Sequence, residues 1–172
     1  MKGRGGMGFE LKRLPRASLD AAIAKAAHYR DLNQPEEAES ICRDVLDLDP
    51  GHQAARKLLG LALTDRFVSG EVGLVEQAVE AFESLSDEYD RIYHVGVAWE
   101  RAAKAHLERG EAHSAVTAFE HALSLFSKAE GMRPDSPDPV LRWNRCVRLL
   151  ESHPSLRAAL HAPREDDVHM GD

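Results

Sequence analysis

Small residues recur at a fixed interval in the first part of this chain, and that interval most limits what the chain can fold into. Ala26 and Gly60 lie 34 residues apart, and each is followed by another small residue, Ala38 or Ala78, among apolar residues at three- and four-residue steps. A unit of this length with helical spacing predicts two antiparallel helices, repeated along the chain. Repeated helix pairs present an extended surface, so the spacing indicates binding more than catalysis.

The apolar pattern predicts seven or eight helices and no strand between residues 18 and 161. A first pair is expected over about 19–32 and 35–48, and a second pair from residue 52 to a break at 69–70 and then over 74–85. A longer third pair follows over about 89–109 and 111–131. A proline-rich connector at 132–139 then leads to a helix over about 140–150 and a short one from Pro154 to Leu160.

The repeat is not uniform along the chain. Ala38 and Ala78 lie 40 residues apart, about six more than the basic interval, and we expect the extra residues in the turn around Phe67 to Gly73. Gly60 and Ala103 lie 43 residues apart, so the third unit is longer again. The helix pair is therefore predicted throughout, whereas regular stacking is expected to fail after the second unit.

Small residues are also expected where the two helices of each pair cross, because only small side chains let two helix backbones approach closely. The expected crossings are Ala26 opposite Ala38, Gly60 opposite Ala78, and Ala103 opposite Ala115.

In the spacing of these small and aromatic residues, the chain resembles the tetratricopeptide repeat family, whose pattern is W-x2-L-G-x2-Y, then A-x3-F, then P. The first unit matches with Ala26, Tyr29, Ala38 and Pro50; the second with Leu59, Gly60, Ala78 and Phe82; the third with Trp99, Ala103, Ala115, Phe119 and Ala122. The resemblance implies an all-α solenoid of antiparallel helix pairs, with about three repeats. The segment from Trp143 to Leu150 is then either a C-terminal capping helix or the first helix of an incomplete fourth repeat.

Charge divides the chain into three predicted parts. Residues 1–17 form a basic, glycine-rich arm with a formal charge of +4. Because the net charge of the whole chain is −7, the remaining residues together carry −11. We expect the arm and an acidic tail at 162–172 to be disordered, on either side of a helical domain at 18–161. An acidic body argues against nucleic-acid binding, although the arm alone offers charge for anionic lipid or nucleic acid.

The setting expected from the sequence is the cytoplasm. No apolar run approaches the roughly 20 residues that cross a bilayer, and glycines interrupt the stretch where a secretory signal would need to be apolar. Cys42 and Cys146 lie in separate helical patterns, which indicates buried free thiols rather than a disulfide.

We expect no enzymatic activity, cofactor or metal. The segment from Gly3 to Gly8 formally reads G-x-G-x-x-G, but no strand precedes it as a dinucleotide site requires. No motif in the sequence has the spacing of a catalytic nucleophile and its general base. Among the nine histidines, His106 and His113 flank the turn at Gly110, and a cryptic metal site built on them is the weakest alternative.

The resemblance implies that the first helices of successive repeats line a concave groove for a segment of a partner protein. Helical projection places five candidate binding residues on that face: Lys57, Leu61, Arg101, Lys104 and Asn144. Lys57, Arg101, Lys104 and Asn144 suit a carboxylate or the backbone of an extended peptide. The alternative is that the charged members are ordinary solvated charges beside Asp65, Glu100 and Glu108.

Some members of the family clamp a C-terminal carboxylate with Lys, Asn and Arg from three successive first helices. Here the corresponding positions hold Ile23, Ala27 and Leu58, and only Arg101 fits, so that clamp is not expected. The sequence predicts a non-enzymatic adaptor that binds a protein or peptide. The rival prediction is a structural protein that self-associates as a homodimer, with Leu125, Phe126 or Trp143 at the contact.

Overall fold

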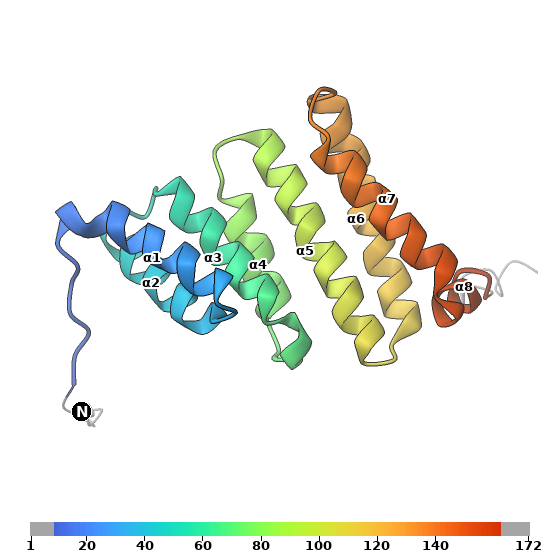
Figure 1. Ribbon diagram of the computed structural model, residues 1–172, viewed down its shortest axis with the longest axis horizontal. Helices are drawn as coiled ribbons and strands as arrows, with labels where there is room; N and C mark the ends of the chain where they lie inside the picture. The colour runs from blue at the N-terminus through green and yellow to red at the C-terminus, as the bar shows by residue number, and fades with distance from the viewer. Residues whose placement is uncertain (1–8, 163–172) are drawn as a thin grey trace, which may run out of the picture.

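A computed structural model of the chain describes residues 9–162, and within that range every regular element is a helix. The helices stand side by side in chain order, from α1 at one end of the molecule to α8 at the other (Figure 1). Two short 3-10 helices, Arg16–Ser18 and Phe67–Ser69, accompany them. The α-helices are α1 Leu19–Asp31, α2 Pro35–Leu48, α3 Gln53–Asp65, α4 Leu74–Glu83, α5 Glu88–Glu108, α6 Ala112–Met132, α7 Asp138–Ser152 and α8 Pro154–Leu160.

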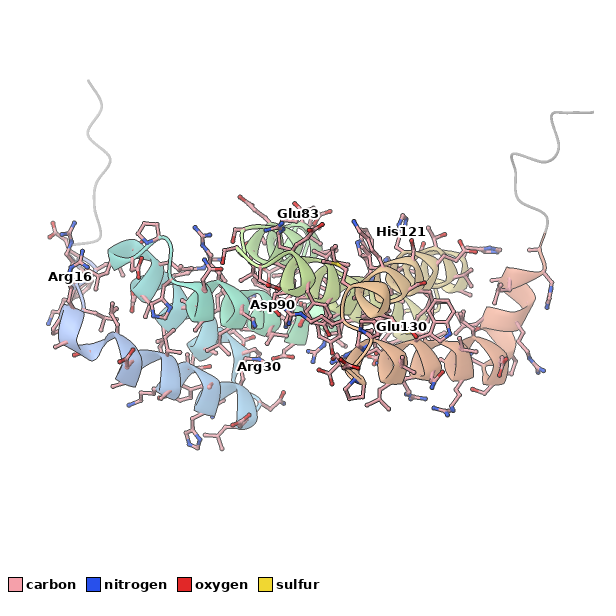
Figure 2. All side chains as sticks on the ribbon, turned by 90° about the horizontal axis from the view of Figure 1, so that it is seen from above. Arg16, Arg30, Glu83, Asp90, His121 and Glu130 are labelled. Atoms are coloured by element: carbon pink, nitrogen blue, oxygen red, sulfur yellow. The ribbon has the colours of Figure 1, made fainter. Side chains whose placement is uncertain are left out.

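Each helix packs against the next one, and α1 to α6 form three antiparallel pairs (Figure 1). The first helix α3 also contacts the first helices α1 and α5 on either side of it. The first helices therefore share one face of the molecule and the second helices share the other. Figure 2 shows the two faces, with Arg30 of α1 on one side and Glu83 of α4 and His121 of α6 on the opposite side. The predicted all-α fold of stacked helix pairs is confirmed.

Two of the turns within pairs reverse the chain with a residue in the left-handed region. Asn33 has φ 57° and Gly110 has φ 78°. The next backbone N–H reaches back over the helix end in both cases: Gln34 donates to the Tyr29 carbonyl and Glu111 donates to the His106 carbonyl, each at 2.9 Å. These bonds satisfy carbonyls at the helix end that have no partner within the helix, so both turns are closed and compact.

The small residues predicted at the crossings are all buried. Ala26, Ala38, Ala78, Ala103 and Ala115 have no solvent exposure, and Gly60 is buried as well. A Cβ atom on Gly60 would lie 2.4 Å from a ring carbon of Phe82, closer than real Cβ atoms approach a neighbour. The α3–α4 pair therefore depends on the missing side chain at this position.

The extra residues of the second unit occupy the predicted turn. After α3 the chain forms the 3-10 helix Phe67–Ser69, passes through Gly70 and Gly73 with positive φ, and enters α4 at Leu74. Phe67 and Leu74 are buried at the two ends of this turn. The insertion is thus a longer loop anchored at both ends, and it leaves the helix pair intact.

The third pair is the longest, with 21 residues in α5 and 21 in α6. Gly96 of α5 and Phe126 of α6 pack closely, because a Cβ on Gly96 would lie 2.8 Å from the Phe126 ring. Phe126 has no solvent exposure. The prediction that Phe126 contributes to a homodimer contact is therefore wrong, since its ring fills the core of this hairpin.

The last two helices close the array. α7 packs on α6, and the seven-residue α8 packs on both α6 and α7. Cys146 of α7 and Leu156 of α8 are fully buried. α7 thus stands where a first helix of a fourth pair would stand, with a shortened second helix covering its C-terminal half.

Helical structure runs from Arg16 to Leu160, while residues 9–15 form neither helix nor strand. The predicted disorder of the arm and the tail concerns mainly residues 1–8 and 163–172, which lie outside the described residues and for which it stays a prediction.

Gly60→Ala tests the close crossing. We expect the free energy of unfolding to fall by about 1–3 kcal/mol, because the new methyl group overpacks against Phe82 and this outweighs the better helix propensity of alanine. Gly131→Ala in α6 is the matched control, since a Cβ there meets nothing within 4 Å. Urea unfolding of both variants measures the difference, and equal effects would contradict the close crossing.

Candidate functional site

The face formed by the first helices contains a cavity of about 390 Å³ between α1, α3 and the α4–α5 turn. Its apolar lining comes from Ile23 and Ala27 of α1, Ala54, Leu58 and Leu61 of α3, and Leu85 of the turn. Gln53, Lys57, Ser86, Asp87 and Asp90 complete the rim. We call this site the first-helix cavity; it brings together residues from three successive units.

Helix α3 supplies most of this lining because two of its sides are apolar. Leu59 and Leu63 are buried toward α2 and α4, whereas Leu58 and Leu61 are only partly buried and turn toward the cavity. Residues three and four apart lie on one face of a helix, so residues 54, 58 and 61 occupy one side and residues 59 and 63 another. A single helix thereby holds the core together and also presents apolar side chains to the cavity.

The α4–α5 turn at the rim is held firmly in place. Arg91 donates to the carbonyls of Leu85 at 2.7 Å and Ser86 at 3.0 Å, and Asp87 accepts the backbone N–H of Asp90 at 2.8 Å as the N-cap of α5. Gln53 of α3 accepts from the Ser86 backbone at 2.8 Å. These bonds fix the cavity edge before anything binds, which lowers the entropic cost of binding.

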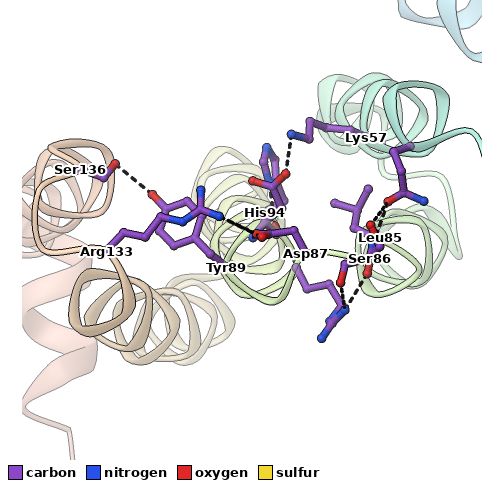
Figure 3. Close-up of polar contacts among 11 residues, drawn as sticks. Lys57, Leu85, Ser86, Asp87, Tyr89, His94, Arg133 and Ser136 are labelled. Carbon is purple, nitrogen blue, oxygen red and sulfur yellow. Dashed lines mark hydrogen bonds and ion pairs between the residues drawn. The ribbon is translucent and has the colours of Figure 1, made fainter.

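A second set of contacts fastens the same turn from the other side, as Figure 3 shows. Arg133, in the α6–α7 connector, donates to both oxygens of Asp87 at 3.0 and 2.9 Å, and its guanidinium lies 4.1 Å from the centre of the Tyr89 ring. The Tyr89 hydroxyl lies 3.0 Å from Ser136 of the connector. The start of α5 is therefore clamped between α3 and the connector.

Ion pairs join the first helices along this face. Asp65 of α3 accepts from Arg30 of α1 at 2.7 Å and also from Arg101 of α5, so one carboxylate links three units. Lys57 of α3 pairs with Asp90 of α5 at 2.8 Å. All these side chains are at least partly exposed, so each pair contributes modestly to stability and mainly fixes the relative position of the helices.

Glu100 of α5 extends the series to α7 and is the most buried charged group on this face, with 1% exposure. It accepts from Lys104 of its own helix and from Arg142 of α7 at 2.8 Å, and Arg142 also donates to the Tyr93 hydroxyl at 3.1 Å. Burial alone would raise the pKa of the Glu100 carboxyl, but the hydrogen bonds from Lys104 and Arg142 outweigh burial and hold the pKa below its ordinary value.

Two of the five predicted binding residues, Lys57 and Leu61, line the first-helix cavity. Arg101 and Lys104 lie farther along α5, and Asn144 is half-buried on α7. Lys57, Arg101 and Lys104 are each engaged by a carboxylate of this chain. Their positive charge is thus already balanced, and a partner carboxylate would have to compete for it.

Sequence reasoning missed most of the apolar lining. The sequence did not identify Ile23, Ala27 and Leu58 as binding residues, and noted instead that a carboxylate clamp would need polar residues there; the structure gathers them in the first-helix cavity. The signal was present in Ile23 and Ala27, which lie apart from the crossing residue Ala26, whereas Leu58 belongs to the apolar stripe of its helix. Leu85 carried no such signal, since its position depends on the turn.

The remaining chemical groups are placed as follows. His106 contacts Glu111 and Arg109 at the α5–α6 turn, while His113 is exposed on α6. Among residues 9–162, no group of three His, Cys, Asp or Glu side chains is arranged to hold a metal ion.

Cys42 and Cys146 are free and buried, and burial raises the pKa of each thiol to about 12. Over the described residues 9–162, no helix has the length and apolar character to cross a bilayer.

Comparison with protein-family models matches residues 19–52 to the tetratricopeptide repeat. The matched segment covers α1, α2 and the turn that leads to α3, including Ala26, Tyr29, Ala38 and Pro50. Together with the stacked helix pairs, this match supports a tetratricopeptide repeat protein, as the sequence predicted. The repeat is in general a protein-interaction module. A comparison with curated proteins returns no match.

Glu100→Gln tests the buried carboxylate. The lowered pKa means that the charged carboxylate stabilises the fold above the pKa of the unfolded chain, and that this contribution is lost as pH falls through the folded pKa. We expect the variant to lose about 2 kcal/mol of unfolding free energy at neutral pH. The gap to wild type should narrow once the pH falls below the ordinary glutamate pKa of about 4.3, and it should close below the lowered pKa of the folded state.

Urea unfolding across this pH range measures the gap, with Glu108→Gln, an exposed residue of the same helix, as the control. A gap for Glu100→Gln that does not change with pH would contradict the assigned charge state.

Proposed function

We propose that this chain is a non-enzymatic protein-interaction module that binds a short segment of a partner protein on the face of its first helices. The first-helix cavity is the centre of the proposed site, with Lys57 and Leu61 in its lining and Arg101, Lys104 and Asn144 farther along the same face. The single observation that supports this most is the apolar lining contributed by α1, α3 and the turn before α5.

The lining indicates what the partner segment must offer. Ile23, Ala27 and Leu58 are apolar, and the nearest cation, Lys57, is paired with Asp90. A large apolar side chain entering this cavity loses contact with water, which contributes about 1.5–3 kcal/mol. We therefore propose an apolar anchor residue in the partner, rather than a terminal carboxylate, as the feature that is recognised.

The rim supports recognition without a large rearrangement. The α4–α5 turn is fixed by Arg91 and Gln53 on one side and by the Arg133–Asp87 contact on the other. A preformed edge loses little order on binding, so a modest interface suffices for measurable affinity. The proposed mechanism is shape complementarity around one anchor, with the charged pairs setting the distance between helices.

We also propose that the protein acts in the cytoplasm as an adaptor or scaffold. Two free, buried cysteines whose thiols have a pKa of about 12 suit a reducing compartment.

A second candidate function, self-association through α7, is favoured by one observation: Leu141 is 62% exposed and Trp143 is 37% exposed. A mass in sedimentation that rises with concentration in wild type and not in Trp143→Ser would favour it.

Ala54→Arg tests the proposed site, because Ala54 lines the first-helix cavity yet is itself exposed, so the long side chain covers the opening without disturbing the core. Peptides are first selected from a random library against the wild-type chain, and their affinity is then measured by fluorescence anisotropy. We expect Ala54→Arg to weaken binding at least about tenfold, equivalent to about 1.4 kcal/mol.

Ala24→Arg provides the matched control, since Ala24 is exposed on α1 and does not line the cavity. It is expected to bind like wild type, and circular dichroism should show equal helix content in both variants. Selected peptides that bind Ala54→Arg as tightly as wild type, or a library that yields no binder, would contradict the proposal.

A further inference from the structure

The opposite face, formed by the second helices, carries a separate groove between α2 and α4. One cavity of about 340 Å³ is lined by the apolar residues Leu46, Leu59, Leu63 and Ala81, and its charged lining residues are Arg43, Arg56 and Glu80. A neighbouring cavity of about 370 Å³ shares Arg43, Leu46 and Leu59 with the first. Three lining residues are common to both, so the two cavities adjoin, and together we call them the α2–α4 groove.

This face is strongly acidic. Helix α2 has five acidic residues and one arginine, α4 has three acidic residues, and α6 has two acidic residues and one lysine. Together α2, α4 and α6 carry a formal charge of −8. The first helices α1, α3, α5 and α7 carry +1 in total. The two faces therefore differ in the partners that they attract: the second-helix face favours a basic segment.

A basic segment of the chain itself passes beside this face, with its side chains still exposed. Lys12 and Arg13 share a cavity of about 320 Å³ with Asp44 and Asp47 of α2. Leu11 lines the end of the α2–α4 groove beside Leu46 and Leu59. The same segment belongs to an arm whose residues 1–17 carry a formal charge of +4, so its charge is complementary to that of the surface beside which it passes.

The apolar residues of this arm segment lack partners of their own. Phe9 is 94% exposed and Leu11 is 91% exposed, although both are large and apolar. Residues 9–15 form neither helix nor strand. When such a segment binds in extended form, residues two apart point to the same side. In that bound form Phe9 and Leu11 face the same way and stand about 7 Å apart along the segment.

We infer that the α2–α4 groove is a docking site for the chain's own N-terminal arm. Leu11 and Phe9 occupy the apolar floor over Leu46 and Leu59, while Lys12 and Arg13 remain beside Asp44 and Asp47. The groove is then a second interaction surface, on the opposite face from the first-helix cavity and independent of it. A partner with the same combination of apolar and basic residues would have to displace the arm to bind there.

Cross-linking in the full chain tests this docking. Glu10→Cys in the arm is combined with Gln77→Cys at the edge of the groove on α4, or with Glu83→Cys, which is exposed on the same helix outside the groove. A short bis-maleimide then joins the cysteines. Native Cys42 and Cys146 are buried, and burial raises their pKa to about 12, so they react slowly.

We expect the Gln77 pair to give cross-linked monomer at least about fivefold faster than the Glu83 pair at low salt, since docking raises the effective concentration of the arm at the groove. Leu11→Ser should remove this preference, and high salt should reduce it. Equal rates for the two pairs, or a preference that survives Leu11→Ser, would overturn the inference. Cross-linked dimer as the main product would also overturn it, because the occupant would then be the arm of a second copy.

Discussion

The close approach of paired helices at small residues is the constraint on which the rest of this structure depends. Gly60 leaves room for the Phe82 ring, and Gly96 leaves room for the Phe126 ring. Helices that cross at such short distances bury a continuous apolar seam, so each pair forms a stiff unit. Stacking such units places all first helices on one face and all second helices on the other, and both proposed binding surfaces follow from that separation.

The long third pair connects the two halves of the molecule. Asp65 joins the first three units through Arg30 and Arg101, and Glu100 joins the third unit to α7 through Arg142. These carboxylates take up cations that would otherwise face solvent along the first helices. The face is consequently close to neutral, and its apolar cavity, rather than free positive charge, distinguishes it from the acidic face formed by the second helices.

Much of the fold could be predicted from the sequence, because helix ends and crossings are set by local spacing. The spacing of small and apolar residues around Ala26 and Gly60 predicts the first two helix pairs from a few turns of sequence. The break at Gly70 predicts where the insertion lies. The site was harder to predict. The Lys57–Asp90 contact joins residues 33 positions apart, and the place of Leu85 in the cavity depends on how the α4–α5 turn is held. Neither follows from periodicity.

Methyl NMR of the chain during titration with a selected peptide tests most directly whether the first-helix cavity binds a partner segment. We expect shifts of the Ile23, Leu58 and Leu61 methyl signals that saturate with the peptide, while Leu46 of α2 and Leu63 of α3, which line the α2–α4 groove, stay unchanged. Shifts centred on Leu46 and Leu63, or on α7, with Ile23 and Leu58 unaffected, would contradict binding in the first-helix cavity.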